Sequence, residues 1–261
     1  MWVSKYFVFF VVYSFMGWLY ESMYCTIKGG KWENRGFLYG PICPIYGAGA
    51  VALTAIDDYL HYINFQYEWW QVVLVSMLGS MVLEYTTSWV LEKLFHAYWW
   101  DYSDIPFNIN GRICLPCTLG FGGAGLVVAY GIAPFTRSVL GHIGPVGMEF
   151  VSLVFMGIVA IDTALTVSAL SNFARTVEGL QEALNKHMDQ FVTSVQGKAQ
   201  AAGNLISEEK ERFSRENMEQ ALTTMGSTYR AAVKRVKGFK RAPEGGQLQR
   251  TFDAIKKRVR R

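Results

Sequence analysis

Long apolar segments follow one another along the first two thirds of the chain. A helix that crosses a bilayer needs about 20 predominantly apolar residues. Five segments have that character, at roughly 5–26, 38–57, 69–92, 113–133 and 146–170. The pattern predicts an all-α membrane protein with about five transmembrane helices. No small-residue cleavage signal follows the first segment, so we expect it to be a retained helix rather than a signal peptide.

Two stretches share one order of features, which predicts a duplicated helix-hairpin unit. In each stretch an apolar helix carries a glutamate, a loop leads to an arginine, and an apolar segment with an early proline and spaced glycines follows. We expect parallel repeats, related by an axis along the membrane normal. A chance likeness between two hairpins with basic turns is the alternative. The units are about 10–56, with Glu21 and Arg35, and about 73–130, with Glu84 and Arg112.

The hydrophobic pattern changes near residue 171 to that of a soluble helix. From Phe173 to Val195, apolar residues recur in steps of three and four, which predicts a coiled-coil seam. A second such run covers 218–236. Such tail helices pack as a hairpin or between protomers, so a homo-oligomer formed through them is one expectation. The final piece, 247–261, has an apolar edge on a basic body, which suits an anionic lipid surface. Nucleic acid is not expected as a partner, because no aromatic stacking platform accompanies the charge.

Charge is divided unevenly between these two parts. Residues 171–261 hold 18 Lys/Arg against 10 Asp/Glu, whereas residues 1–170 hold 7 against 11. We therefore expect a transmembrane domain at 1–170, whose fifth helix is about 146–170, and a basic cytoplasmic helical tail at 171–261. Cytoplasmic loops of membrane proteins are enriched in Lys and Arg. The loop after the first helix is basic and the loop at 57–68 is acidic. This places the N-terminus outside a bacterial cell membrane and the C-terminus in the cytoplasm.

Charged residues inside the apolar helices are the candidates for function. On insertion scales each costs roughly 2.5–3.5 kcal/mol, so such residues usually have a role. One interpretation is a cytoplasm-facing polar site that holds an anionic solute or headgroup on its arginines. The alternative is that the acids and arginines only neutralise one another and fix the packing. The candidate ligand-binding residues are Glu21, Asn34, Arg35, Tyr46, Glu84, Asp101, Tyr102, Asn110, Arg112 and Asp162.

The loop before Arg112 and the cysteines add two further hypotheses. The aromatic, acidic stretch at 100–108 is typical of a lid or of an interfacial anchor. Cys114 and Cys117 have the spacing of a redox or metal pair, but packing thiols are the favoured interpretation, and no metal or cofactor is expected. The chain has no P-loop, no H-E-x-x-H and no G-x-S-x-G, so ATP-driven work would need a separate ATP-binding subunit. We assign no catalytic residues, although a hydrolytic or transfer reaction would have Glu21 and Glu84 as its acid or base candidates.

Four motifs in order carry a family resemblance. They are YSFMGWLYE, NRGFLYGPICPIYGAGA, LEYTTSWVLEKLF and WWDYS-x-x-PFNINGRICL. With these motifs, roughly residues 5–170 resemble the ABC-transporter type IV, or CmpB, family of bacterial membrane proteins. The family's name implies a permease, but it contributes no catalytic residues. The tail lies outside the resemblance.

The leading functional hypothesis is a permease-like transport component embedded in the lipid bilayer. The first alternative is a membrane enzyme that acts on an anionic lipid headgroup. The second is a scaffold whose tail recruits a cytoplasmic partner.

Overall fold

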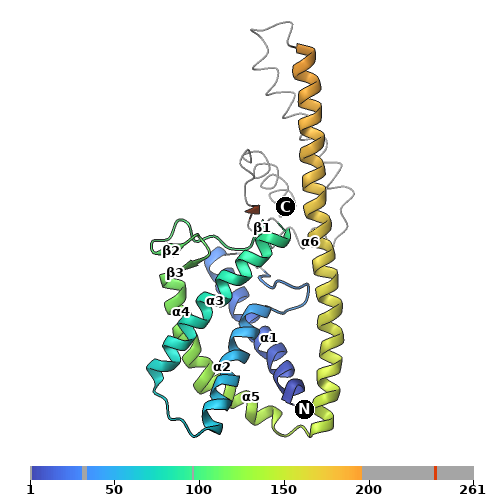
Figure 1. The fold of residues 1–261 in the computed structure, drawn as a ribbon. Coiled ribbons are helices and arrows are strands. Elements are labelled where there is room, and N and C mark those ends of the chain that lie inside the picture. The colour runs from blue at the N-terminus through green and yellow to red at the C-terminus, as the bar shows by residue number, and fades with distance from the viewer. Residues whose placement is uncertain (1, 31–33, 96, 196–237, 240–261) are drawn as a thin grey trace. The chain divides into compact units, whose positions relative to one another are not determined.

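The structure is a computed structural model that describes residues 2–30, 34–95, 97–195 and 238–239. It is almost entirely helical. Its elements, in chain order, are α1 (Trp2–Gly29), α2 (Pro44–Tyr62), α3 (Trp69–Phe95), β1 (Ala97–Tyr98), β2 (Asn108–Ile109), β3 (Ile113–Cys114), α4 (Leu115–Val127), the π-helical turn η1 (Val128–Ile132), α5 (Ala133–Leu140), α6 (Pro145–Val195) and β4 (Gly238–Phe239) (Figure 1).

The chain forms two compact units. The first contains Met1–Val90 and Trp100–Thr166, and the second contains Leu91–Trp99 and Val167–Arg261. In the first unit β2 pairs antiparallel with β3, and in the second β1 pairs antiparallel with β4. The polar residues considered for function lie in the first unit.

Four helical stretches within the described residues are long and apolar enough to cross a membrane. They are Trp2–Ile27, Trp69–Phe95, Leu115–Leu140 and Pro145–Asn172. Large apolar side chains such as Leu78, Val82 and Phe150 are exposed on these helices. In a membrane such side chains contact lipid tails, which explains why a chain this apolar leaves them uncovered. The protein is therefore a multi-pass membrane protein.

The second predicted span, 38–57, differs from the helix that forms there. α2 begins at Pro44, after an extended Cys43, and continues to Tyr62. Proline is favoured in the first turn of a helix because its missing N–H needs no partner there. The residues before it form a loop, in which the Ile42 N–H donates to the Gly40 carbonyl at 2.8 Å.

The fourth predicted span, 113–133, is the first part of a longer helical segment. α4, η1 and α5 follow one another without a break to Leu140. Pro134 lies in the first turn of α5, directly after the π-helical turn. A wider turn accommodates a position where proline removes a helical hydrogen bond. The helical segment thus continues past Pro134 to Leu140, whereas the sequence pattern predicted that it ends at residue 133.

α6 also extends beyond its predicted end at about residue 170. Its apolar first half corresponds to the expected fifth span, and its backbone stays helical to Val195. The coiled-coil seam from Phe173 onward depends on side chains that lie outside the described ones. The predicted helical run at 218–236 and the basic piece at 247–261 also lie outside the described residues.

Candidate functional site

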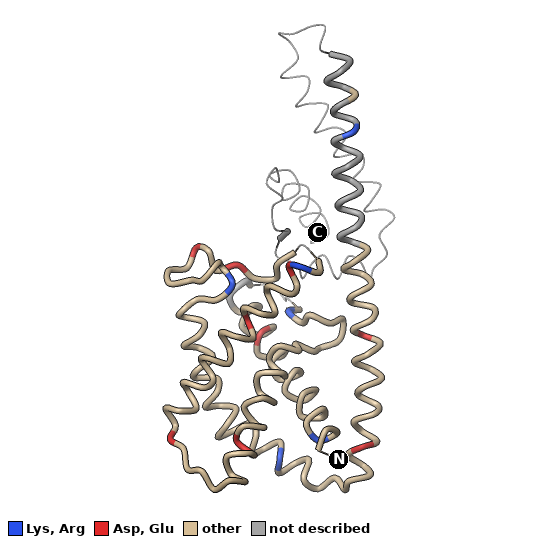
Figure 2. The backbone as a smooth tube through the Cα atoms, in the orientation of Figure 1, with Lys and Arg blue, Asp and Glu red and all other residues tan. Residues whose placement is uncertain are grey.

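Charged residues of the first unit gather towards its two ends, and few lie along the helices between them (Figure 2). One end carries the loops that follow α1 and α3. The other carries the start of α1, the end of α2, and α5 (Figure 1). We call them the loop end and the hairpin end. The predicted site residues lie towards the loop end.

Glu21 of α1 accepts a short hydrogen bond from a tyrosine of α2 and makes a longer contact with Arg35. The Tyr46 hydroxyl donates to Glu21 Oε2 at 2.6 Å. The Nε of Arg35 lies 3.8 Å from Glu21 Oε1, and both side chains are partly exposed. The expected Glu21–Arg35 pair therefore forms, but at the long limit of an ion pair, and such partly exposed pairs contribute little to stability.

Glu84 of α3 is much more deeply buried. Its residue is 4% exposed, and its Oε2 atom has no hydrogen-bond partner within the described part of the chain. The Tyr102 hydroxyl lies near enough to the Glu84 side chain to stabilise its charge, and Glu21 is near enough for the two negative charges to interact. Burial, and next the Glu84 charge, raise the pKa of Tyr102 well above its usual value. The phenol is therefore neutral and available as a donor.

Arg112 does not form an ion pair with Glu84, although both come from the same predicted repeat. Its Nη1 donates to Ser88 Oγ at 3.1 Å, and its guanidinium lies 5.5 Å from the centre of the Tyr85 ring. The Trp100 indole N–H donates to the Arg112 carbonyl at 2.8 Å. An arginine held by a hydroxyl and an aromatic face is positioned by hydrogen bonding and a cation–π contact rather than by the expected acid.

Asp162 of α6 binds the backbone of the loop that precedes α2. Its two carboxylate oxygens accept the N–H groups of Tyr39 and Gly40, each at 2.8 Å. The Thr166 hydroxyl donates to it at 3.3 Å. A side chain at Gly40 would put its Cβ 2.8 Å from Asp162 Oδ2, so the close approach requires glycine. Both oxygens of Asp162 are thus engaged in fixing the loop before α2.

Three other candidates shape loops. The Asn34 side-chain oxygen accepts the Trp18 indole N–H at 2.8 Å and the Gly36 N–H at 3.0 Å. Asp101 accepts from the N–H and hydroxyl of Ser103. Asn110 has a φ of 53° and donates to the Tyr85 hydroxyl at 3.2 Å. Side-chain oxygens that bond nearby backbone are typical of turns.

The structure therefore brings together only part of the predicted set. Glu21 accepts a hydrogen bond from Tyr46, and both Glu21 and Tyr102 lie within electrostatic range of Glu84. We call these four residues the acid cluster.

The hairpin end holds a charged cluster that sequence reasoning did not assemble. Arg137 Nη2 lies 2.6 Å from Asp57 Oδ2 and 2.7 Å from Asp58 Oδ1. Lys5 also pairs with Asp58, at 3.1 Å, and the Tyr6 hydroxyl donates to Asp58 at 2.8 Å. In the sequence these residues indicated only loop charge. The signal that could have found them is two adjacent acids at the end of an apolar helix and a single arginine far along the chain.

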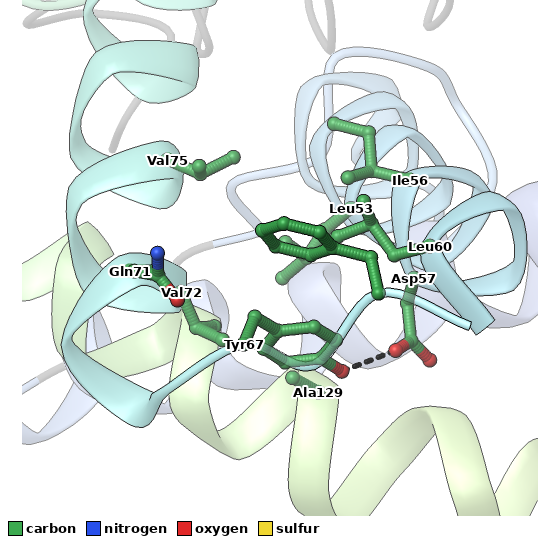
Figure 3. A pocket seen from close by; sticks show the side chains of 10 residues that line it. Leu53, Ile56, Asp57, Leu60, Tyr67, Gln71, Val72, Val75 and Ala129 are labelled. Atoms are coloured by element: carbon green, nitrogen blue, oxygen red, sulfur yellow. Dashed lines mark hydrogen bonds between the residues drawn. The ribbon is translucent and has the colours of Figure 1, made fainter. Parts of the chain in front are cut away.

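A cavity of about 160 Å³ lies beside this cluster (Figure 3). Most of its lining is apolar and comes from α2, the loop that follows it, α3 and η1. At its edge the Tyr67 hydroxyl donates to Asp57. Burial, and next that hydrogen bond, raise the pKa of Tyr67 well above its usual value, so the phenol stays a donor.

All four cysteines are free thiols. Cys114 is buried and Cys117 is partly exposed, at the start of α4. Within the described residues, no group of three or more His, Cys, Asp or Glu side chains is arranged to hold a metal ion.

Comparisons with known proteins gave one finding. A family model described as "Putative ABC-transporter type IV" matches residues 8–167, which is more than half of the chain. Comparisons with curated proteins and with solved structures found no match.

Proposed function

The chain belongs to the ABC-transporter type IV family, and from that membership we propose that it is the membrane-embedded, permease-like component of a transporter. The observation that carries the proposal is the buried polar set at the loop end. Glu84, Arg112 and Asp162 are each at most 9% exposed, in a unit whose outer surface is apolar. Ionisable residues that face the interior of a membrane protein commonly mark a path for solute or ions.

We propose that the membrane domain crosses the bilayer five times, with α2 as a fifth crossing. α2 runs antiparallel to α1 over its whole length, because Tyr46 near its start meets Glu21 and Asp58 near its end meets Lys5. Its 19 residues span about 28 Å at 1.5 Å each, close to the thickness of a bilayer core.

The orientation of these crossings follows from the distribution of charge. The loop after α1 is basic, the end of α2 and the loop after it carry Asp57, Asp58 and Glu68, and the chain beyond 171 is strongly basic. With five crossings, this places the N-terminus outside, and the loop end and the tail in the cytoplasm. The acid cluster would then be reached from the cytoplasmic side of the cell membrane.

We also propose that the two hairpins are duplicated copies. In each, a serine of the first helix packs on a glycine of the second: Ser14 on Gly47, and Ser76 on Gly125. The loop arginine also reaches a serine of the first helix in both copies. The backbone N–H of Arg35 donates to Ser22 Oγ at 3.3 Å, and the side chain of Arg112 donates to Ser88 Oγ at 3.1 Å. These matched contacts support a common origin better than the order of motifs alone.

A transporter of this class needs a source of energy outside this chain. The sequence has no phosphate-binding loop, so ATP hydrolysis would be supplied by a separate ATP-binding subunit. The cytoplasmic tail offers a surface for that subunit or for a second copy of the chain. The basic segment at 247–261 would hold the tail near anionic lipid.

Purification of the full chain in mild detergent, with identification of the bound proteins by mass spectrometry, tests the proposal. We expect an ATP-binding protein in stoichiometric yield, and ATP hydrolysis by the complex. Arg112→Gln should leave the ATP-binding subunit bound, because Arg112 is buried and does not form the contact surface. The variant should nevertheless reduce the ATP turnover of the complex severalfold. Recovery of a partner without nucleotide-binding ability would favour a scaffold and contradict the proposal. Recovery of no partner at all would also contradict it.

A further inference from the structure

Among the residues that the structure describes, no positively charged group is paired with the Glu84 carboxylate. It lies in α3, one of the membrane-spanning helices, and is 4% exposed. Its Oε2 atom has no hydrogen-bond partner within the described residues. An ionised carboxylate that is buried without a paired charge is strongly unfavourable, so such a group binds a cation or takes up a proton.

In the described part of the chain, the groups that face Glu84 come from three segments, and none of them is positively charged. Tyr102 of the loop after α3 lies near it, Glu21 of α1 repels it, and the Cys117 thiol of α4 lies near both Glu84 and Tyr102. Described arginines at this end are directed elsewhere. Arg35 lies against Glu21 and Arg112 against Ser88. The described side chains therefore leave the negative charge at Glu84 uncompensated.

We propose that the Glu84 carboxylate is the binding site for one monovalent cation, either a proton or a sodium ion. Glu21 adds to the negative potential there, and the Tyr102 hydroxyl supplies a second oxygen. A carboxylate and a phenolic oxygen are hard ligands, which suit a hard, singly charged ion. A divalent metal is not favoured, since no larger cluster of His, Cys, Asp or Glu occurs within the described residues.

The bound cation would connect the two hairpins of the first unit. Glu21 belongs to α1 and Glu84 to α3, so neutralising Glu84 removes a repulsion between their helices. Release of the cation would restore that repulsion and favour separation at the loop end. This role rests on the proposed transport function, whereas the binding itself does not.

The test compares purified full-length protein in sodium chloride and in choline chloride at equal ionic strength. If sodium is the ligand, the Tm of the wild type rises by several degrees in sodium chloride, and Glu84→Gln abolishes the rise. If a proton is the ligand, the infrared spectrum at neutral pH contains the C=O band of a carboxylic acid, which Glu84→Gln removes. Glu68→Gln, at an exposed loop position, is the matched control and should preserve either signal.

A wild-type protein with neither a sodium response nor a protonated carboxyl band would overturn the proposal. If Glu84→Gln fails to fold, Glu84→Asp keeps a carboxylate and should retain the signal in weaker form, and its complete loss would count against the site. None of these measurements involves transport or an ATP-binding subunit. Failure here therefore leaves the proposed function standing, and failure of the co-purification experiment leaves the cation site standing.

Discussion

At the scale of single residues, Arg137 of the hairpin end contacts two carboxylates. Its Nη2 contacts both Asp57 and Asp58, and it is only partly exposed. Two adjacent carboxylates at a helix end repel each other, and the arginine from a distant part of the chain offsets that repulsion. One side chain thus ties α5 to the end of α2.

Arg137→Gln should therefore destabilise the protein markedly. Removing one partner of a buried ion pair is strongly destabilising, and the partial exposure here reduces the expected loss to about 2–3 kcal/mol. The change is measured as a fall in Tm of the purified protein in detergent. Lys5→Gln, which removes a more exposed partner of Asp58, is the control and should cost less than about 1 kcal/mol.

The combination of Arg137→Gln with Asp57→Asn checks the cause of that loss. Because both changes disrupt the same contact, their effects on stability should be less than additive. Simple addition, or an equal loss from Lys5→Gln, would mean that the cluster is not the origin of the effect.

At the scale of elements, the two helices within each hairpin approach each other closely at a glycine. Any Cβ at Gly47 of α2 would overlap Ser14 Oγ and lie 2.6 Å from the backbone oxygen of Phe10. In lipid, helix association depends on packing and hydrogen bonding, so small residues at the contact are decisive. The buried Ser14 and its glycine set the distance between α1 and α2.

Gly47→Ala should separate α1 from α2 and destabilise the protein by about 1–3 kcal/mol, as other overpacked substitutions do. Gly123→Ala, in α4, is the matched control. No atom lies within 4 Å of a Cβ built there, so alanine should be neutral or stabilising by up to about 1 kcal/mol. Thermal unfolding of the two purified variants would distinguish them. Equal stability would show that the α1–α2 contact tolerates a wider spacing.

At the scale of the whole molecule, the course of α2 decides the topology. Its contacts with both ends of α1 imply that it returns through the thickness that α1 crosses. The adjacent aspartates make α2 less apolar than the other long helices, so composition alone does not distinguish a crossing from a helix at the surface. The contacts with α1 favour the crossing.

Single cysteines introduced on the two sides of α2, in a background without the native cysteines, test this topology. With α2 as a crossing, Pro41→Cys should be protected from a membrane-impermeant maleimide in intact cells, and Tyr62→Cys should react. Both positions are exposed in the structure. Permeabilised cells are the control, in which both variants should react. Reaction of the two variants from the same side would exclude the five-crossing arrangement.

Much of the molecule could be predicted because it depends on local pattern. The lengths of the apolar segments fix which helices can cross a bilayer, and the order of motifs led to the family that the comparison with family models confirmed. Glu84 was identified from the sequence for the same reason, since an acid in an apolar segment is conspicuous whatever surrounds it.

Which buried side chains contact one another could not be predicted from the sequence, because these contacts depend on the rotation and register of whole helices. The sequence matched Glu84 with Arg112 by their order in the repeat, yet Arg112 turns to Ser88 and Tyr85. It also gave no reason to join Arg137 to Asp57, 80 residues away. The sequence by itself determined that this is a multi-pass helical membrane protein with charges in its spans. Only the tertiary structure decided which charges are compensated and that, among the described residues, Glu84 has no such partner. Helix packing, rather than proximity in the sequence, selects the neighbours of a buried side chain.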